Sequence, residues 1–246
     1  MVAIFNTFIH DPIYNALAFL VDIIPSGDVG IAIILLTLAV KLILFPLSLK
    51  AVRTQAAMRE IDPELKRIRE EHKNNREESA RQTMALLKEK KVNPLASVFL
   101  VLIQLPVIIG LYFVFFNGGN GINFSETLLY SFVPFPTDAS FTFLGFIDLT
   151  GRSVSLSILV ALTQFVNARI MQLPAPSGEA GTLSHDLGKS MQMQMKYVFP
   201  IVMGVIAYII SAAIALYFLV SNLFQLFQEL YVKRTAAQAS AQNTSS

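Results

Sequence analysis

The chain of 246 residues contains no cysteine and no tryptophan, and it has few charged side chains. Without cysteine it can form no disulfide, no thiolate metal site and no cysteine nucleophile, and no cysteine can carry a lipid anchor. Only 15% of its residues are charged, against roughly 25% in an ordinary soluble protein. The apolar share of 54% and the mean hydropathy of +0.56 instead indicate several membrane-spanning helices.

The motifs of common enzyme classes are absent as well. The sequence contains no HExxH, no GxSxG and no P-loop. The three histidines, His10, His72 and His185, lie outside the long apolar stretches. An intramembrane protease would therefore lack its base or its metal ligands. We expect no catalytic residue, no metal site and no cofactor.

Lysine and arginine are missing from residues 1–40, and a chain start without basic residues argues against a secretory signal peptide. Residues 50–93, by contrast, hold 12 of the 19 basic residues and 8 of the 17 acidic ones. Cytoplasmic loops of membrane proteins are enriched in Lys and Arg. Residues 50–93 are therefore predicted to lie in the cytoplasm.

Four apolar stretches are long enough to cross a bilayer, which takes about 20 helical residues. The last is long enough for two short spans, with a break expected near Ser211 in IISAAIA. The pattern predicts an all-α polytopic membrane protein of five spans, with its N-terminus outside and its C-terminus in the cytoplasm. The predicted segments are an extracytoplasmic N-terminal segment (1–28), a first span (29–49), a cytoplasmic helical hairpin (50–93), a second span (94–116), an extracytoplasmic loop (117–152), a third span (153–173), a cytoplasmic loop (174–196), a hairpin of the fourth and fifth spans (197–231) and a disordered cytoplasmic tail (232–246).

Three of these segments have predicted structure outside the membrane core. With Asp11 as N-cap and Pro12 at the first helical position, residues 12–24 predict an interfacial helix on the outer leaflet, or a frayed apolar lead-in. Asp62 is the predicted N-cap of the first helix in the cytoplasmic hairpin, and a turn at 73–75 precedes the second. The basic outer faces of that hairpin could contact anionic lipid or ribosomal RNA, and charge alone does not separate the two. The aromatic-rich loop 117–152 is expected to lie in the outer interface.

Lys41 is the most costly polar residue of the predicted spans. It lies in LTLAVKLILFP, and a lysine at the centre of a spanning helix costs about 2.5–3.5 kcal/mol on insertion scales. Within the predicted spans the one carboxylate is Glu229, at a cytoplasmic end. Polar residues on helix faces accompany Lys41: Thr37, Gln104, Gln164, Asn167 and Ser211. Together they predict a hydrated cavity in the inner half of the membrane. The alternatives are a snorkelling Lys41 and ordinary hydrogen bonds between helices.

Four blocks of sequence resemble, in order and in spacing, the membrane protein insertases of the YidC/Oxa family. The blocks are GIAIILLTLAVKLILFPLSLKA (30–51), VNPLASVFLVLIQLPVIIGLYFVF (92–115), FTFLGFIDL (141–149) and SAAIALYFLVSNLFQLFQ (211–228). The resemblance implies a five-helix core around a hydrophilic groove that opens to the cytoplasm and to lipid and is closed outside. It points to the short form of Gram-positive-like bacteria. The chain departs from the family in having SAA at 211–213 where a Pro–Gly is usual.

The resemblance also implies roles for individual residues. The groove of the family carries a cation, usually an arginine, that attracts acidic residues of the incoming chain, and Lys41 stands at that position. The other groove residues would be Thr37, Gln104, Gln164, Asn167 and Ser211. A substrate slide along the second and fifth spans would include Leu105, Pro106, Tyr217 and Phe218.

The resulting hypothesis is an insertase and chaperone of the bacterial plasma membrane that works without the Sec translocon or together with it. The expected partners are nascent membrane proteins and lipids, with the ribosome, the SecYEG translocon and signal recognition particle components, and no DNA. Two alternatives stay open: a small transporter or channel with an anion site at Lys41, and an assembly chaperone without insertion activity. No internal repeat of the kind common in transporters is visible.

Overall fold

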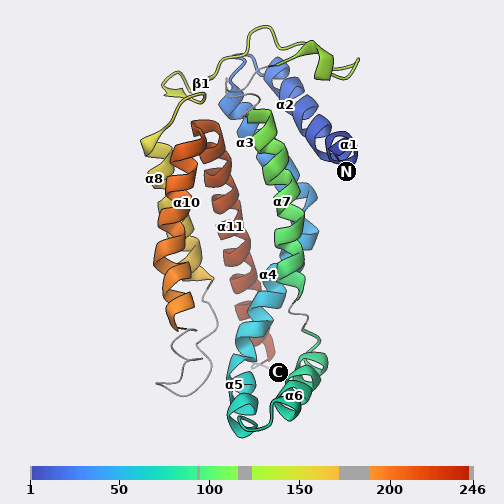
Figure 1. Ribbon diagram of the computed structural model, residues 1–246, viewed down its shortest axis with the longest axis vertical. Coiled ribbons are helices and arrows are strands. Elements are labelled where there is room, and N and C mark those ends of the chain that lie inside the picture. The colour runs from blue at the N-terminus through green and yellow to red at the C-terminus, as the bar shows by residue number, and fades with distance from the viewer. Residues whose placement is uncertain (1, 93–94, 116–123, 172–188, 244–246) are drawn as a thin grey trace. The chain divides into compact units, whose positions relative to one another are not determined.

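The computed structural model describes residues 2–92, 95–115, 124–171 and 189–243 (Figure 1). This part of the chain is mostly helical, which confirms the predicted helical class. In chain order the elements are α1 (Val2–Phe5), the π-helix η1 (Asn6–His10), α2 (Asp11–Ile23), α3 (Val29–Ile43), α4 (Phe45–Glu60), α5 (Asp62–Glu71), α6 (Arg76–Glu89), α7 (Leu95–Phe115), the short η3 (Glu126–Leu128), β1 (Thr142–Phe143), β2 (Ile147–Asp148), α8 (Val154–Ile170), the π-helix η4 (Gln194–Val198), α10 (Phe199–Ile210) and α11 (Ala212–Asn243).

Two of the described helices are long and apolar enough to cross a bilayer, Lys189–Ile210 and Ala212–Thr235. The bent pair α3 and α4 gives a third span if the two helices count as one. Shorter apolar helices cover Leu105–Phe115 and Val154–Ile170. These lengths fit a helical membrane protein, and the complete set of five spans stays a prediction.

The predicted first span, residues 29–49, is interrupted. α3 ends at Ile43, where the Leu44 N–H still donates to the Val40 carbonyl at 3.0 Å, and α4 begins at Phe45. Pro46 has no N–H, so it cannot donate back to Leu42 and extend the helical ladder. Hydropathy runs evenly across the break, so Pro46 is the one local signal of it.

The chain forms two compact units, each with its own core. The first unit comprises Met1–Phe45, Val101–Gln164 and Pro200–Gln225. Its buried apolar side chains come from α2, α3, α7, α8, α10, α11 and the described residues between α7 and α8. The second unit comprises Pro46–Leu100, Phe165–Phe199 and Leu226–Ser246, with a smaller core between α5 and α6. Each unit is described by itself below.

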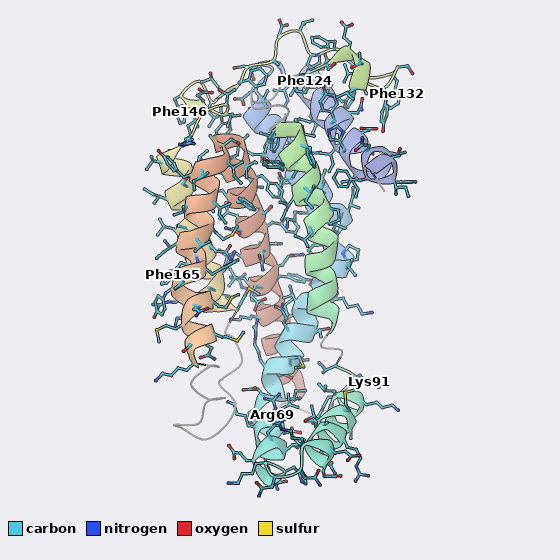
Figure 2. All side chains as sticks on the ribbon, viewed as in Figure 1. Arg69, Lys91, Phe124, Phe132, Phe146 and Phe165 are labelled. Carbon is cyan, nitrogen blue, oxygen red and sulfur yellow. The ribbon has the colours of Figure 1, made fainter. Side chains whose placement is uncertain are left out.

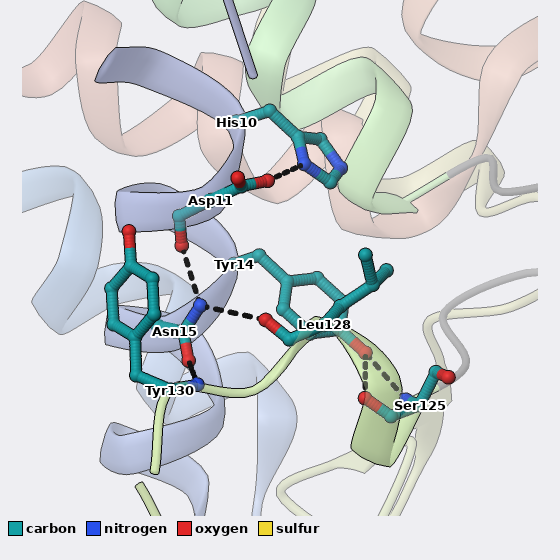
Figure 3. A network of polar contacts seen from close by, with 7 residues as sticks. All are labelled: His10, Asp11, Tyr14, Asn15, Ser125, Leu128 and Tyr130. Carbon is teal, nitrogen blue, oxygen red and sulfur yellow. Dashed lines mark hydrogen bonds and ion pairs between the residues drawn. The ribbon is translucent and has the colours of Figure 1, made fainter. Parts of the chain in front are cut away.

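In the first unit, a network of polar contacts ties α2 to residues 125–130, around η3 (Figure 3). The Asn15 amide donates to the Leu128 carbonyl at 3.0 Å and accepts from the Tyr130 N–H at 2.6 Å. The Tyr14 hydroxyl accepts from the Ser125 N–H at 2.5 Å. Asn15 is only 3% exposed, and a buried amide must find such partners. The network therefore fixes residues 125–130 to α2.

Two predicted N-caps are wrong for the same reason. His10, ahead of Asp11, has helical backbone angles because η1 runs directly into α2, and the Asp11 carboxylate contacts the His10 ring at 2.8 Å instead of capping. Ile61 is helical in the same way, and Asp62 lies inside α5, where it pairs with Lys66 at 3.0 Å. A capping side chain needs an extended residue at the cap, and neither His10 nor Ile61, the single turn residue between α4 and α5, is extended.

Asp28 joins α3 to the hairpin of β1 and β2. One of its carboxylate oxygens accepts from the N–H groups of Gly30 (2.8 Å) and Ile31 (3.2 Å), which caps α3. The other oxygen accepts from the Leu144 N–H at 2.8 Å. Leu144 lies in the turn between β1 and β2, which pair antiparallel. One side chain thus sets where α3 begins and holds the hairpin against it.

Two aromatic side chains between α7 and α8 are among the most exposed large apolar groups of the first unit. Phe132 is 77% exposed, and Phe146, next to the β-hairpin turn, is 73% exposed (Figure 2). Aromatic rings prefer the interface between lipid and water. This exposure fits the expectation that the outer loop lies in that interface.

The helices α8, α10 and α11 pack side by side in the first unit (Figure 1). Gly204 of α10 lies so close to α8 that a Cβ there would come within 2.9 Å of the Ala161 Cβ and 3.1 Å of the Ser157 carbonyl oxygen. α11 contacts α8 as well, since the Asn222 amide of α11 donates to the Thr163 hydroxyl of α8 at 3.2 Å. Small residues allow close approach and a buried amide adds a hydrogen bond, which is how helices associate in lipid.

In the second unit, α5 and α6 form a hairpin around the buried side chains of Ile61, Leu65, Leu86, Leu87 and Val92. The Asn75 side chain accepts from the Glu78 N–H at 3.1 Å and caps α6 after a turn. Hydrogen bonds from Gln82 and Arg81 to the Glu78 carboxylate lower its pKa. α5 and α6 thus share a small apolar core, and the cytoplasmic hairpin over residues 50–93 stays a prediction.

Candidate functional site

The candidate site begins on α3, an apolar helix with two polar side chains near its end. Thr37 is 2% exposed, and its hydroxyl donates to the Ile33 carbonyl one turn earlier at 2.6 Å. Lys41 follows Thr37 by four residues and lies in the last turn. Because residues four apart share a helix face, the hydroxyl and the ammonium belong to one side of α3, as predicted from the spacing.

The opposite side of α3 is apolar and open. Leu35, Ala39 and Leu42 recur at intervals of three and four residues, and all three are exposed. Lys41 is only half-buried and Thr37 is buried, on the side away from that stripe. In a bilayer an exposed apolar stripe is the natural lipid-facing surface. The lysine therefore does not share the face of α3 that suits lipid best.

The other predicted groove residues occupy different environments. Gln164, at the end of the first unit's part of α8, is half-buried. Ser211 breaks the helical run between α10 and α11, and its hydroxyl accepts from the Ile214 N–H at 3.3 Å. Asn167 is 2% exposed and belongs to the second unit. Gln104 belongs to α7, but its side chain lies outside the described residues. The grouping of these residues around Lys41 stays a prediction.

The four predicted slide residues differ in how much surface they present. Leu105 is 46% exposed, whereas Tyr217 is 3% exposed within the core of the first unit. Pro106 and Phe218 are half-buried, and the rings of Tyr217 and Phe218 lie 5.5 Å apart between centroids. Leu105 is therefore the member that offers a contact surface in this conformation.

Sequence reasoning missed how the carboxylate of Glu229 is satisfied. Glu229 is 3% exposed and accepts from the Arg59 guanidinium at 2.6 Å, within the second unit. Its neighbour Gln228 donates to the Ser48 hydroxyl at 2.5 Å. A lone carboxylate at the end of a span signals that a cation must be near, but the 170 positions between Arg59 and Glu229 hide which one.

Further contacts bind α11 to α8 in the second unit. The Lys233 ammonium donates to the Ile170 carbonyl at 2.6 Å, which satisfies a carbonyl at the end of α8. Within the described residues, no group of three or more His, Asp or Glu side chains could hold a metal ion.

The fold and the site define a helical membrane protein with polar side chains within its apolar helices, and comparison with known proteins gives its family. A family model described as 60Kd inner membrane protein matches residues 20–239. The chain is 31% identical over 217 residues to the membrane protein insertase YidC of Clostridium tetani, covering 88% of this chain and 87% of that one. It is 30% identical over 233 residues to the insertase YidC of Fusobacterium nucleatum, covering 94% and 100%. With the insertase YidC of Alcanivorax borkumensis it shares 31% over 239 residues, covering 92% of this chain and 36% of that one.

The chain belongs to the YidC family of bacterial inner membrane protein insertases. This confirms the resemblance inferred from its four sequence blocks. Each of the three relatives is named as a membrane protein insertase.

Proposed function

We propose that this protein inserts nascent membrane proteins into the bilayer through a polar groove whose charge is Lys41. The observation that carries the proposal is that Lys41 and Thr37 share one side of α3, opposite its exposed apolar stripe. Membership of the insertase family supports the same function. Placing a cation such as Lys41 in an apolar spanning helix costs about 2.5–3.5 kcal/mol. A role in binding the substrate explains why a lysine stands there.

The groove would lower the energy of a polar segment that must cross the membrane. Each carboxylate of an incoming tail costs about 2.5–3.5 kcal/mol at the bilayer centre. Water in the groove and the ammonium of Lys41 would offset part of this cost. The proposed lining is Thr37, Lys41, Gln104, Gln164, Asn167 and Ser211.

The apolar part of the substrate would leave the groove sideways into lipid. We assign this exit to the helices α7 and α11, with Leu105, Pro106, Tyr217 and Phe218 as the contact residues. Leu105 offers a surface already, while Tyr217 is buried in the core. Substrate contact at Tyr217 would therefore require α11 to shift from its present packing.

We further propose the topology and partners that this function needs. The N-terminus and the segment 117–152 would lie outside, and the α5–α6 hairpin and the C-terminus in the cytoplasm. The contacts of α2 with Ser125, Leu128 and Tyr130 support a common side for the N-terminal helix and the outer segment. The cytoplasmic face would meet the ribosome, signal recognition particle components and, for some substrates, the SecYEG translocon.

Replacement of Lys41 tests the role of its charge. In vesicles that contain the purified protein, Lys41→Ala should impair insertion of a single-span protein with an acidic N-terminal tail. Lys41→Arg should insert it as the natural protein does, because the charge is kept. Protease protection of the tail measures insertion. Equal insertion by all three proteins would contradict an electrostatic role for Lys41.

A further inference from the structure

A second polar site lies in the second unit, where the start of α4 meets the end of α6. A cavity of about 450 Å³ is lined there by the cations Lys50, Arg53, Lys90 and Lys91, with Leu49 and Val92 among its apolar walls. All of these residues belong to the second unit. None of the residues that line the cavity is one of the proposed groove residues.

The charge of this cavity is of one sign. Among the described residues that line it there is no aspartate and no glutamate. Lys90 forms a long ion pair with Glu64, which does not line the cavity: 3.5 Å separate the ammonium from the carboxylate. Four cations around one cavity repel each other. An anion bound among them would relieve that repulsion.

The backbone at Lys91 is held in a conformation that lysine rarely adopts. Its φ of 53° is in the left-handed region, where glycine is the usual residue at the end of a helix. The Lys91 N–H donates to the Lys88 carbonyl at 3.2 Å, and the Val92 N–H donates to the Leu87 carbonyl at 2.9 Å. A cation stands where glycine would suit the backbone better, and such strain often marks a functional position.

The surroundings of the cavity indicate what kind of anion it takes. Pro46 and Leu49 line it, and they begin only three residues after α3 ends at Ile43. The chain changes there from an apolar helix to a strongly basic segment, as it does where a span leaves the hydrocarbon and enters the headgroup layer. Phosphates of acidic lipids lie at that depth. Apolar walls beside the cations also suit the glycerol and upper acyl chain of a lipid better than the backbone of RNA.

We infer that the cavity between α4 and α6 binds the phosphate-bearing headgroup of an acidic phospholipid. Lys50, Arg53 and Lys91 contact the phosphate, and Leu49 and Val92 contact the apolar part of the lipid. Lipid bound there ties the α5–α6 hairpin to the membrane surface at its base. This role does not depend on the groove at Lys41.

Native mass spectrometry of the full-length protein, titrated in detergent with phosphatidylglycerol or phosphatidylcholine, tests the inference. The natural protein should retain phosphatidylglycerol in preference. Lys91→Gly and Arg53→Gln should each weaken that retention about fivefold, the effect of one interfacial basic residue. Lys91→Gly also relieves the left-handed backbone, so a loss of lipid with an unchanged or raised thermal midpoint cannot come from misfolding. Lys88→Gln removes a charge from the same helix end outside the cavity and should leave retention unchanged.

Three results would overturn the inference. One is an equal loss of phosphatidylglycerol in Lys88→Gln, which would mean that only the overall charge matters. Another is full competition by millimolar inorganic phosphate or glycerol phosphate, which would make the cavity a site for free anions. The third is a loss of ribosome co-sedimentation in Lys91→Gly with lipid retention unchanged, which would assign the cavity to RNA.

Discussion

At the scale of single residues, the ion pair of Arg59 and Glu229 is the most consequential contact of the second unit. Glu229 is almost completely buried, and the Arg59 side chain is 19% exposed. A charge in such a place needs its partner, since an uncompensated buried charge is costly. The pair therefore fastens α11 to α4.

Glu229→Gln should destabilise the protein by about 3 kcal/mol, the low end for a broken buried pair because Arg59 keeps some access to water. The amount of protein that stays monodisperse in size-exclusion chromatography after heating measures the effect. Arg59→Gln with Glu229→Gln should recover most of the loss, because neither charge is then left alone. Simple addition of the two single effects would show that the pair is not coupled.

Asp28 is the second residue whose replacement should weaken contacts in two elements, the start of α3 and the β1–β2 hairpin. Asp28→Ala removes the cap of α3, worth about 1 kcal/mol, and leaves the Leu144 N–H without its acceptor, which costs about 1–3 kcal/mol more. The same heating assay should show a lower midpoint. Protease digestion should also cut the β1–β2 hairpin more readily. Asp28→Asn keeps an acceptor oxygen and should lose less, whereas an equal loss would exclude a capping role.

At the scale of elements, the packing of α10 on α8 depends on the missing side chain of Gly204. A methyl group there would overlap Ala161 and crowd the Ser157 carbonyl, so the helices would have to separate. Gly204→Ala should cost about 1–3 kcal/mol, the usual range for overpacking. Val205→Ala on the same helix, at a position 51% exposed, is the matched control and should change the midpoint little. A stabilised Gly204→Ala protein would contradict this close contact.

Some elements could be predicted from the sequence because their signals are local. Asn75 ends a turn and caps α6, and the break at Ser211 separates two apolar helices. The break after Ile43 was missed because apolar residues continue on both sides of it, and only Pro46 marks it. The caps at Asp11 and Asp62 were wrong because the helix before each one runs on without an extended residue.

The candidate site was predictable only in part, for a related reason. Lys41 and Thr37 share a face through helical spacing alone, which sequence can show. The partners of Glu229 and Asn222 lie on other helices, and such pairings follow from packing that no local pattern encodes. The burial of Tyr217 in the core likewise follows from tertiary packing.

At the scale of the whole molecule, the proposed topology makes a direct prediction. The chain has no cysteine, so single cysteines introduced at exposed positions report their side of the membrane. Cysteine at Ser26 or Thr137 should react with a membrane-impermeant maleimide on intact cells. Cysteine at Glu77 or Arg234 should react only after the cells are opened. Labelling of Glu77→Cys from outside would reverse the topology.

The absence of cysteine also permits a direct test of whether nascent chains pass along the Lys41 side of α3. Leu44 lies three residues from Lys41 on the same side and is half-buried, whereas Leu42 belongs to the exposed stripe and is 62% exposed. A ribosome-stalled single-span protein with one cysteine in its acidic tail should form a disulfide with Leu44→Cys far more than with Leu42→Cys. Replacing the acidic residues of the tail should weaken the Leu44→Cys product. Equal products at both positions, or a product only at Leu42→Cys, would contradict the groove.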